Sequence, residues 1–486
     1  MTPIDPLYVH QLDIVGAGGR DEWTLLRILN RCRTPMGRRA FRRRLLNPVT
    51  DAAVLEARYD EIAAAAGWPP GMAKDLANVG DIEAAFRRVA LRRTSPCELP
   101  GLAASLELCA ETCRAASRVA NMAATRVRER IVSAVDLETA SLFSLDDVRR
   151  NVFLPGYSAD LDSRQAELDT LVGAFTAAAA DLNAVAGVEW VRVDSNDVDG
   201  FWLAVTARRW DAIKEKLPVP SRFAAGAGPG AGVKVTLVDV SNDKILATQA
   251  ALASGVRAAF LAFLGTLATE SEAEVAETVE TIEQIDVALT CSDNAASGRH
   301  VRPTLFPLGG GGGGGGGGGS WLRAAGVRHP VIEHLNDGIP YVPNDVALSC
   351  PSSGPHGMLL YGVNAVGKSS LGKAVGVSVV MAQAGMFVPC AALDLGPFEQ
   401  LWTRIGMRDD MGRGRSTFVV EMLELRNVLR SADARTLVIG DELCAGTEAA
   451  SALSIVGAGI ATLCERGSAF VFATHLHQVS GVKVRR

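Results

Sequence analysis

Four residues in the last third of the chain have the types and the spacing that bind a nucleotide phosphate. Gly362, Gly367, Lys368 and Ser369 complete the pattern G-x-x-x-x-G-K-[ST], between the apolar run "MLLY" and a helical segment that starts near Lys368. In such a loop the glycines let backbone N–H groups turn towards phosphate oxygens, and the start of the helix adds positive potential. The lysine bridges the outer phosphates, and the serine hydroxyl reaches Mg²⁺. The sequence therefore predicts a site for ATP and Mg²⁺.

Two acids further along the chain could complete this chemistry. Asp441 and Glu442 follow the apolar run "TLVIG", in which residues 437–439 are predicted to form a buried strand. One acid would hold Mg²⁺ through water, and the other would orient or deprotonate an attacking water. Solvated carboxylates are also common at strand ends, so the pair alone is weak support. Its position after the glycine loop favours the catalytic interpretation.

Two more segments narrow the class of nucleotide site. In "GRGRSTFVVEM", Ser416 and Thr417 stand where a helix would begin, as an N-cap pair directed at an anion. In "FVFATHLH", His475 ends a predicted strand and could donate a hydrogen bond to a γ-phosphate; an ordinary surface histidine is the alternative. The order of loop, serine helix, acidic pair and histidine is typical of ATPases in which two protomers enclose two nucleotides. In those dimers each serine helix completes the other subunit's site.

The elements that must position these residues follow from hydrophobic patterning. The apolar runs "GMLLY", "TLVIG" and "AFVFAT" alternate with helical segments, which predicts an α/β domain with a mostly parallel sheet covered on both faces. Residues 24–182 are rich in helix formers at amphipathic spacing, so long packed helices are expected. The segment "VEWVRVDSNDVDGFWLAVTARRW" instead alternates apolar and polar residues around Gly200, as in a short sheet. Helices resume near Asp243.

The expected organisation is therefore multidomain: a long-helix core or lever domain, a small β-containing clamp inserted in it, and a P-loop ATPase domain of the ABC type. We expect the glycine run at residues 309–319 to be a flexible spacer, because it has no side chains to bury. The predicted boundaries are helical residues 1–184, inserted residues 185–245, helical residues 246–306, a glycine-rich segment at 307–320 and ATPase residues 321–486.

Composition limits the alternatives. A formal net charge of −5 gives no whole-chain attraction to nucleic acid. The arginine cluster at positions 38, 39, 42, 43 and 44 is one local candidate for binding it, although a solvated helix face is the favoured interpretation. Nine scattered cysteines form neither a disulfide framework nor a zinc motif, which favours reduced thiols in an intracellular protein. The uncharged run at residues 374–393 is interrupted by polar residues, glycine and proline, so we expect a buried helix followed by a strand rather than a membrane span.

Several of these segments together resemble the MutS family of DNA mismatch-repair ATPases. The resemblance is carried by "YGVNAVGKSSLGKAVGVSVVMAQAGMFVP", "RDDMGRGRSTFVVEM", "DELCAGTE", "FATHLH" and "RHPVIE". Upstream, "LNRCRTPMGRRAFRRRLLNPVTD" is similar to the family's core segment, and "NDVDGFWLAV" resembles the start of its clamp. Together these segments span nearly the whole chain in the family's order.

The resemblance implies a role for each matching residue. Lys368, Glu442 and His475 match the family's catalytic lysine, water-activating acid and γ-phosphate sensor, while Ser369 and Asp441 match the Mg²⁺ ligands. The other matches lie at nucleotide-binding positions, namely Gly362, Asn364, Gly367 and Ser370 in the loop and Ser416, which the family offers across the dimer. Tyr341, in "GIPYVPND", matches an aromatic residue that stacks on adenine, and a plain core aromatic is an equal alternative.

The sequence also departs from the family pattern. Val363, Ala365 and Val366 replace the residues common in the loop, and Gly440 stands where a bulkier residue often precedes the acids. No segment corresponds to the family's N-terminal mismatch-binding domain, and the chain stops soon after His475. We therefore expect either a specialised branch that does not read lesions or an incomplete fragment.

The leading hypothesis is a DNA-dependent ATPase that clamps duplex or branched DNA, acts as a homodimer or a heterodimer with a MutS-like partner, and works inside the cell. Its compartment would be the nucleus or an organelle in a eukaryote and the cytoplasm or nucleoid in a bacterium. One alternative is a chromosome-structural or transport-coupled ATPase of the same sandwich type. The other is a DNA-binding scaffold that does not hydrolyse ATP.

Overall fold

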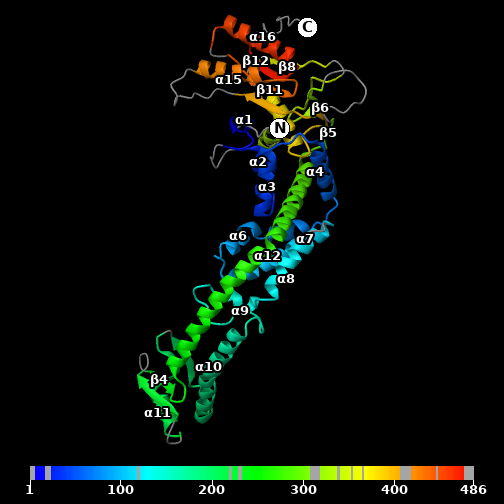
Figure 1. Cartoon of the computed structure of the whole chain (residues 1–486). Helices are drawn as coiled ribbons and strands as arrows, with labels where there is room; N and C mark the ends of the chain where they lie inside the picture. Colours follow the sequence, from blue (N-terminus) through cyan, green and yellow to red (C-terminus); the bar gives the residue numbers. More distant parts are fainter. Residues whose placement is uncertain are drawn as a thin grey trace. The chain divides into compact units, whose positions relative to one another are not determined.

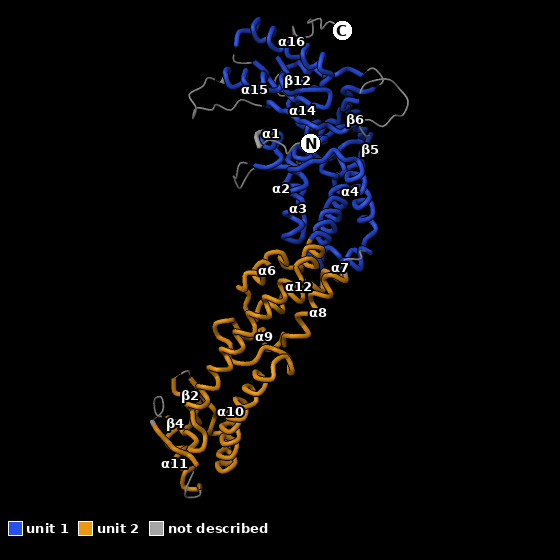
Figure 2. The backbone as a smooth tube through the Cα atoms, viewed as in Figure 1, with its two compact units in different colours: residues 1–78, 112–118, 280–486 blue, residues 79–111, 119–279 orange. Residues whose placement is uncertain are grey.

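A computed structural model gives the fold, and its chain divides into two compact units (Figure 2). Unit 1 contains Met1–Asn78, Thr112–Arg118 and Glu280–Arg486, and unit 2 contains Val79–Glu111 and Val119–Val279. The predicted helical range 1–184 therefore contributes to both units, which differs from the expected boundaries. The structure describes residues 6–16, 23–117, 121–196, 198–217, 222–227, 232–306, 318–336, 340–351, 354–363, 366–405, 417–444 and 447–475.

Unit 2 is built mainly from helices (Figure 1). Short polar side chains begin several of them: Asp81 accepts a hydrogen bond from the N–H of Ala84, and Asp136 accepts one from the N–H of Glu138. Phe153 stacks on Tyr157 with ring centroids 4.1 Å apart. The helices are α6 (Ile82–Ala90), α7 (Leu99–Ala115), α8 (Asn121–Val132), α9 (Leu137–Ser141), α10 (Ala159–Ala186) and α12 (Asn242–Gly298), with a 3₁₀ turn η1 (Pro96–Glu98); α7 and α12 each continue into unit 1.

A small antiparallel sheet lies in the sequence between α10 and α12. Its strand order is β1-β2-β4-β3, and α11 (Ala207–Lys214) follows β2. Gly200 adopts φ +72° at the turn before β2, and a Cβ there would lie 2.8 Å from the side chain of Asn242. The sheet therefore falls within the range predicted for the insertion. Its strands are β1 (Arg192–Asn196), β2 (Gly200–Thr206), β3 (Phe223–Ala227) and β4 (Gly232–Leu237).

Unit 1 contains two four-stranded sheets. One is fully parallel in the order β10-β11-β12-β8, and the other is mixed in the order β5-β9-β6-β7. The mixed sheet was not predicted. The parallel strands are β8 (Gly357–Tyr361), β10 (Gln400–Arg404), β11 (Thr436–Asp441) and β12 (Ala469–Thr474). The mixed strands are β5 (Thr304–Leu305), β6 (Trp321–Val327), β7 (Asn344–Leu348) and β9 (Ala392–Gly396), and α13 (Pro330–Leu335) follows β6.

Helices cover both faces of the parallel sheet, as the sequence predicts. Side chains alternate along β11, so Leu437 and Ile439 join one apolar cluster with α14 (Lys368–Gln383), while Val438 joins another with α16 (Ala449–Glu465). A third helix, α15 (Thr417–Ser431), contacts α16. Nearly every residue of α14 after its first turn is buried, and β9 follows it, which confirms the expected buried helix and strand at residues 374–393.

The N-terminal helices pack on this sheet region, which explains why residues 1–78 belong to unit 1. The Gln11 side-chain oxygen accepts hydrogen bonds from the Thr403 hydroxyl at 2.8 Å and the Ile405 N–H at 3.1 Å, so it caps the edge strand β10. The Tyr59 hydroxyl donates to the Ala382 carbonyl of α14 at 2.6 Å. The helices are α1 (Pro6–Gln11), α2 (Leu25–Leu29), α3 (Pro35–Leu46), α4 (Ala52–Ala65) and α5 (Met72–Ala77).

Three predictions from composition can be compared with the structure. None of the nine cysteines forms a disulfide, and Cys109 and Cys113 are fully buried on α7. The arginines at positions 38, 39, 42 and 43 lie exposed on α3, as expected for a solvated face. Within the described residues, α12 is long and apolar enough to cross a membrane by length and composition. This is weak support for a membrane protein, because the core helix of a water-soluble domain meets the same criterion.

Candidate nucleotide-binding site

The predicted phosphate loop joins the end of β8 to the start of α14. Gly367 is the N-cap of α14 and adopts φ +93°, a left-handed conformation that favours glycine. A Cβ built on Gly367 would have no atom within 4 Å, so the loop has open space above this position. Ser369 and Ser370 lie half-buried in the first turn of the helix. This arrangement presents the start of a sixteen-residue helix to any anion at the loop.

Lys368 lies against the loop it is predicted to serve. Its Nζ donates to the carbonyl oxygens of Gly362 at 2.9 Å and Val363 at 2.8 Å. An ammonium has three N–H donors, so these two bonds leave one for another acceptor. The loop carbonyls therefore hold the lysine in place beside the predicted phosphate position.

The carboxyl ends of three neighbouring strands bring the separate motifs together. In the parallel register Asp441 of β11 pairs with Ala473 of β12, and Thr474 of β12 pairs with Tyr361 of β8. The phosphate loop, the acidic pair and His475 therefore all leave the sheet from the same edge. A ligand site at the carboxyl edge of parallel strands is the usual arrangement in α/β proteins.

His475 directly links the loop to the acidic pair. Its Nδ1 lies 3.1 Å from the Gly362 carbonyl oxygen, and its Nε2 lies 2.7 Å from Oε1 of Glu442. Both partners are acceptors when Glu442 is ionised, so both bonds form together in the imidazolium form of the ring. A backbone carbonyl and two side chains, which lie up to 113 residues apart in the sequence, thus meet in one hydrogen-bonded chain.

Asp441 has the geometry of a metal ligand. Its Oδ1 is buried and has no hydrogen-bond partner among the described residues. Mg²⁺ is usually held by one or two carboxylates together with phosphate oxygens and water, so it needs no larger group of protein ligands. No cluster of three or more histidine, cysteine, aspartate or glutamate side chains suited to a metal occurs within the described ranges. Ser369 and Asp441 therefore fit Mg²⁺ bound together with a nucleotide.

The backbone around the acids has unusual conformations. Glu442 and Cys444 adopt φ +51° and +64°, in the left-handed region that non-glycine residues seldom occupy. The Glu442 N–H donates to the Ala473 carbonyl at 2.9 Å. The Cys444 N–H donates to Oε1 of Glu421 at 2.7 Å, a contact the sequence did not predict. Burial, and secondarily Glu421, raises the pKa of the Cys444 thiol to about 11, so this thiol stays neutral.

The departure at Gly440 also has a structural reason. A Cβ there would lie 2.9 Å from the ring of Phe472 and 3.0 Å from the side chain of Leu443. Phe472 is the register partner of Gly440 on β12. The lack of a side chain at Gly440 therefore lets Phe472 and Leu443 pack against the strand directly before the acids.

Two of the predicted site residues, Asn364 and Ser416, lie outside the described residues. Tyr341 is half-buried and lines a cavity of about 510 Å³, whose other walls come from α2, α13 and the end of α12. The lining of this cavity includes neither Gly362 nor Lys368, and burial, with a smaller contribution from Glu333, raises the pKa of Tyr341. Its proposed contact with adenine stays a prediction.

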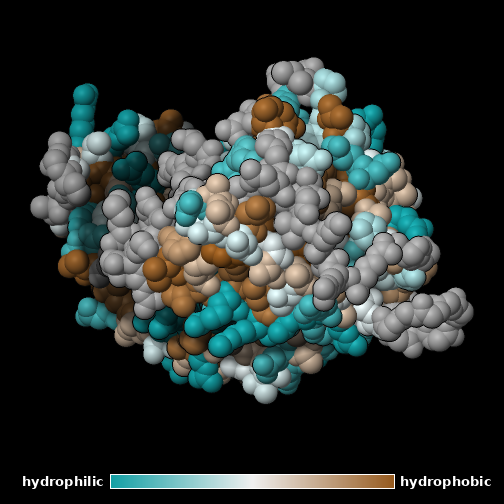
Figure 3. Space-filling model, turned by 90° about the horizontal axis from the view of Figure 1, so that it is seen from above, coloured by the Kyte–Doolittle hydropathy of each residue, from teal (hydrophilic) through white to brown (hydrophobic). Residues whose placement is uncertain are grey.

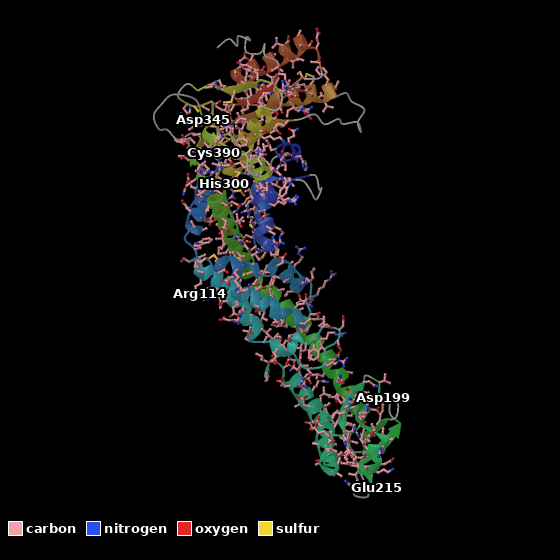
Figure 4. All side chains as sticks on the ribbon, turned by 180° about the vertical axis from the view of Figure 1, so that it is seen from behind. Arg114, Asp199, Glu215, His300, Asp345 and Cys390 are labelled. Carbon is pink, nitrogen blue, oxygen red and sulfur yellow. The ribbon has the colours of Figure 1, made fainter. Side chains whose placement is uncertain are left out.

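The Tyr341 cavity has a polar lining. His300, which follows α12 and is labelled in Figure 4, lines it together with Arg328 and Glu333. Arg328 donates to Glu333 at 3.0 Å, and burial, followed by the charge of Arg328, lowers the pKa of His300 to about 4. The histidine is therefore neutral at physiological pH, and the nearby charges are paired within the protein.

Comparison with known proteins covers nearly the whole chain. Residues 9–292 match MutS domain III, and residues 358–485 match MutS domain V. Two proteins described as "DNA mismatch repair protein MutS", from Azorhizobium caulinodans and Cereibacter sphaeroides, are each 30% identical over 96% of this chain, which covers 51% and 53% of their lengths. A "Mitochondrial DNA mismatch repair protein mutS homolog" from Sarcophyton glaucum is 38% identical over 40% of this chain and 19% of its own.

The chain thus spans about half the length of the curated relatives it matches over most of its own sequence. The two matched domains leave only residues 293–357 between them, and the matches agree with a helical region followed by a sheet-containing region. The chain belongs to the MutS family and carries its domains III and V.

Proposed function

We propose that this chain is a MutS-like ATPase that binds DNA and couples ATP binding and hydrolysis to conformational change, as in mismatch repair or recombination. The observation that carries the proposal is the contact of His475 with both Gly362 and Glu442, because it joins three separately predicted motifs at one sheet edge. Membership of the MutS family supports it, since the relatives are described as mismatch repair proteins.

In this proposal the loop binds and orients the triphosphate. Backbone N–H groups at the start of α14 and the ammonium of Lys368 would contact the phosphate oxygens. Ser369 and Asp441 would hold Mg²⁺, which neutralises charge on the outer phosphates when bound. The unpartnered oxygen of Asp441 supports this assignment. The protein's contribution is then positioning and electrostatic stabilisation, which dominate phosphoryl transfer.

Glu442 would act on the attacking water molecule, and His475 would contact the γ-phosphate. Oε1 of Glu442 accepts the bond from His475, which leaves Oε2 as the oxygen that could orient or deprotonate a water molecule. A γ-phosphate oxygen near Gly362 would give His475 a new acceptor. On the arrival of ATP the histidine could move to the transferred phosphate, and both oxygens of the acid would then be available.

The partners follow from the same proposal. Double-stranded DNA would be held through phosphate contacts, and a second MutS-like subunit would receive Ser416 at its own nucleotide site. Such a protein would work inside the cell, which the absence of disulfides among its nine cysteines supports. All of these are proposals, because the chain spans about half the length of the relatives it matches.

ATP binding and turnover by Lys368→Ala test the site directly. We expect the variant to lose at least about tenfold in ATP affinity together with its turnover, because a charge-assisted phosphate contact is removed. Lys373→Ala is the matched control, since Lys373 lies on the same helix and pairs with Asp13 at 2.6 Å instead. If Lys368→Ala hydrolyses ATP at the wild-type rate, the site assignment is wrong.

A further inference from the structure

We propose that Glu421 is a positioning residue that fixes the turn bearing Glu442 and ties that turn to helix α15. The inference rests on the proposed function and identifies a residue that neither the motifs nor the comparisons assign. Its basis is the 2.7 Å hydrogen bond from the Cys444 N–H to Oε1 of Glu421. This bond joins the segment after β11 to a helix 23 residues earlier in the sequence.

The turn needs outside support because its backbone is strained. Two of its non-glycine residues, Glu442 and Cys444, lie in the left-handed region, which is sterically unfavourable for residues other than glycine. Such conformations persist only where neighbouring groups hold them. At Glu442 the turn is bonded to the sheet, because the Glu442 N–H donates to the Ala473 carbonyl of β12. At Cys444 it is bonded to α15, because the Cys444 N–H donates to Glu421. Without Glu421 the Cys444 N–H would lose this partner, and the acid would be held by the Glu442 N–H bond to the Ala473 carbonyl and by the bond between its carboxylate and His475.

Apolar packing does not replace this contact. No residue between 418 and 431 on α15 is fully buried. A cavity of about 300 Å³ lies beside the helix, lined by residues that include Glu421, Glu424, Gly440, Leu443 and Phe472. Met422, Val428 and Leu429 of α15 pack, partly buried, against the cluster that contains Leu443 and Cys444. Apolar contacts have no direction, however, and the unfilled space beside the helix leaves its exact position to polar contacts. A polar bond therefore sets the distance between the helix and the acidic turn.

Glu424, one helical turn further along, has a different role. It accepts a hydrogen bond from Arg404 of the edge strand β10 at 2.8 Å. It therefore anchors α15 to the edge strand of the sheet. The two glutamates share a helix and a cavity wall, so Glu424 is a matched comparison for Glu421.

The position of Glu421 gives the contact a consequence for coupling. Helix α15 begins at Thr417, the residue after Ser416, which the proposed function assigns to the partner's nucleotide site. Glu421 lies one turn into this helix. If the start of α15 moves when it contacts the partner's nucleotide, the bond would displace the Cys444 amide and, with it, Glu442. The bond would let occupancy of one site alter the geometry of the acid in the other.

The test compares Glu421→Ala, Glu421→Gln and Glu424→Ala in the full chain. ATP turnover, affinity for a non-hydrolysable ATP analogue and hydrogen exchange of a peptide containing Cys444 would be measured for each. We expect Glu421→Ala to lower kcat by about 10- to 100-fold, because a displaced catalytic group costs this much, with analogue affinity within about twofold. The same variant should speed exchange of the Cys444 amide. Glu421→Gln keeps an acceptor oxygen and should restore most of both properties.

Glu424→Ala should lower thermal stability without changing kcat by more than about twofold, as expected for a partly exposed ion pair. Wild-type kcat or unchanged Cys444 exchange in Glu421→Ala would overturn the proposal, as would a Glu421→Gln variant as impaired as Glu421→Ala. Absence of Lys368-dependent hydrolysis in the wild type would instead refute the proposed function, and the exchange measurement would still decide the role of Glu421.

Discussion

Glu442 carries the reactive carboxylate of the proposed mechanism, and its contacts predict how an amide would behave there. Glu442→Gln keeps an oxygen that can accept from His475 but cannot take a proton from water. We expect kcat to fall by about 10²- to 10⁴-fold, the usual contribution of a general base, while ATP affinity stays near wild type. Single-turnover hydrolysis together with equilibrium ATP binding would measure the two effects separately.

Glu448→Gln is the control for this prediction. Glu448 is exposed six residues further on, at the N-cap of α16, where its side chain makes no capping hydrogen bond. Removing its charge should leave kcat unchanged. Rapid turnover by Glu442→Gln would exclude Glu442 as the base.

At the residue scale, the sequence identified the groups whose chemistry is local and missed those whose role depends on a distant partner. Lys368 and His475 belong to motifs with fixed types and order, so the sequence predicts both as site residues, and the structure adds their hydrogen bonds to Gly362. Glu421 lies within the segment "GRGRSTFVVEM", but the sequence predicts no role for it, because that role depends on an amide 23 residues away. The reason for Gly440 likewise appears only when Phe472 lies across it on the next strand.

At the scale of elements, a buried carboxylate joins α12 to the start of α3. Asp286 is fully buried and accepts hydrogen bonds from the Arg33 N–H at 3.0 Å and from both the N–H and the hydroxyl of Thr34 at 2.8 Å. Thr34 in turn caps α3 by accepting from the Gly37 N–H. A Cβ on Gly37 would lie 2.2 Å from Oδ2 of Asp286, so the two helices meet without room for a side chain.

Asp286→Asn should destabilise unit 1 at neutral pH. The amide places an N–H group where an acceptor is needed, so at least one buried donor is left unpaired at a cost of about 1–3 kcal/mol. Urea unfolding would measure the loss. Asp293→Asn is the control, because Asp293 is 46% exposed on the same helix and pairs with Arg33 at the surface. That variant should cost less than about 1 kcal/mol; an equal loss in both would contradict the assigned role.

The difference in stability between the wild type and Asp286→Asn should also depend on pH. Burial raises the pKa of Asp286 above its ordinary value of 3.8, although the hydrogen bonds from Arg33 and Thr34 oppose the shift. The folded state therefore holds this proton more tightly than the unfolded state, and the resulting stability is lost as the pH rises through the folded pKa. The difference in unfolding free energy, wild type minus Asp286→Asn, should fall from about pH 4 upwards and then level off. A difference that rises with pH would show that the hydrogen bonds outweigh burial.

Sequence patterns predicted most elements but not their grouping. The strands after residue 356 and the long helices follow from apolar runs and helical spacing, which are local properties. Residues 1–78 join unit 1 through contacts such as Gln11 with Thr403, which are 392 positions apart and leave no periodic pattern. The mixed sheet was missed for a related reason: its short strand β5 pairs with β9, almost ninety residues later.

At the scale of the whole molecule, charge and surface character restrict how DNA could be bound. The chain has a net charge of −5, so phosphate contacts must come from local groups of basic residues. Figure 3 views the chain from the end that carries α15 and α16, and hydrophilic and hydrophobic residues are intermingled over its coloured surface. The proposed binding of DNA through phosphate contacts should therefore depend strongly on salt.

The DNA-binding proposal predicts a specific pattern in gel-shift titrations of the full chain with homoduplex, mismatched and branched DNA. Affinity should fall linearly with the logarithm of salt concentration, because released counterions supply much of the binding free energy. ATP should change the affinity of the wild type but not of Lys368→Ala, since only the former would bind nucleotide, whereas Lys373→Ala should respond like the wild type. The rank of the three DNA forms would define the preferred structure. Salt-independent binding, or equal ATP effects in Lys368→Ala and the wild type, would separate DNA binding from the nucleotide site and refute their coupling.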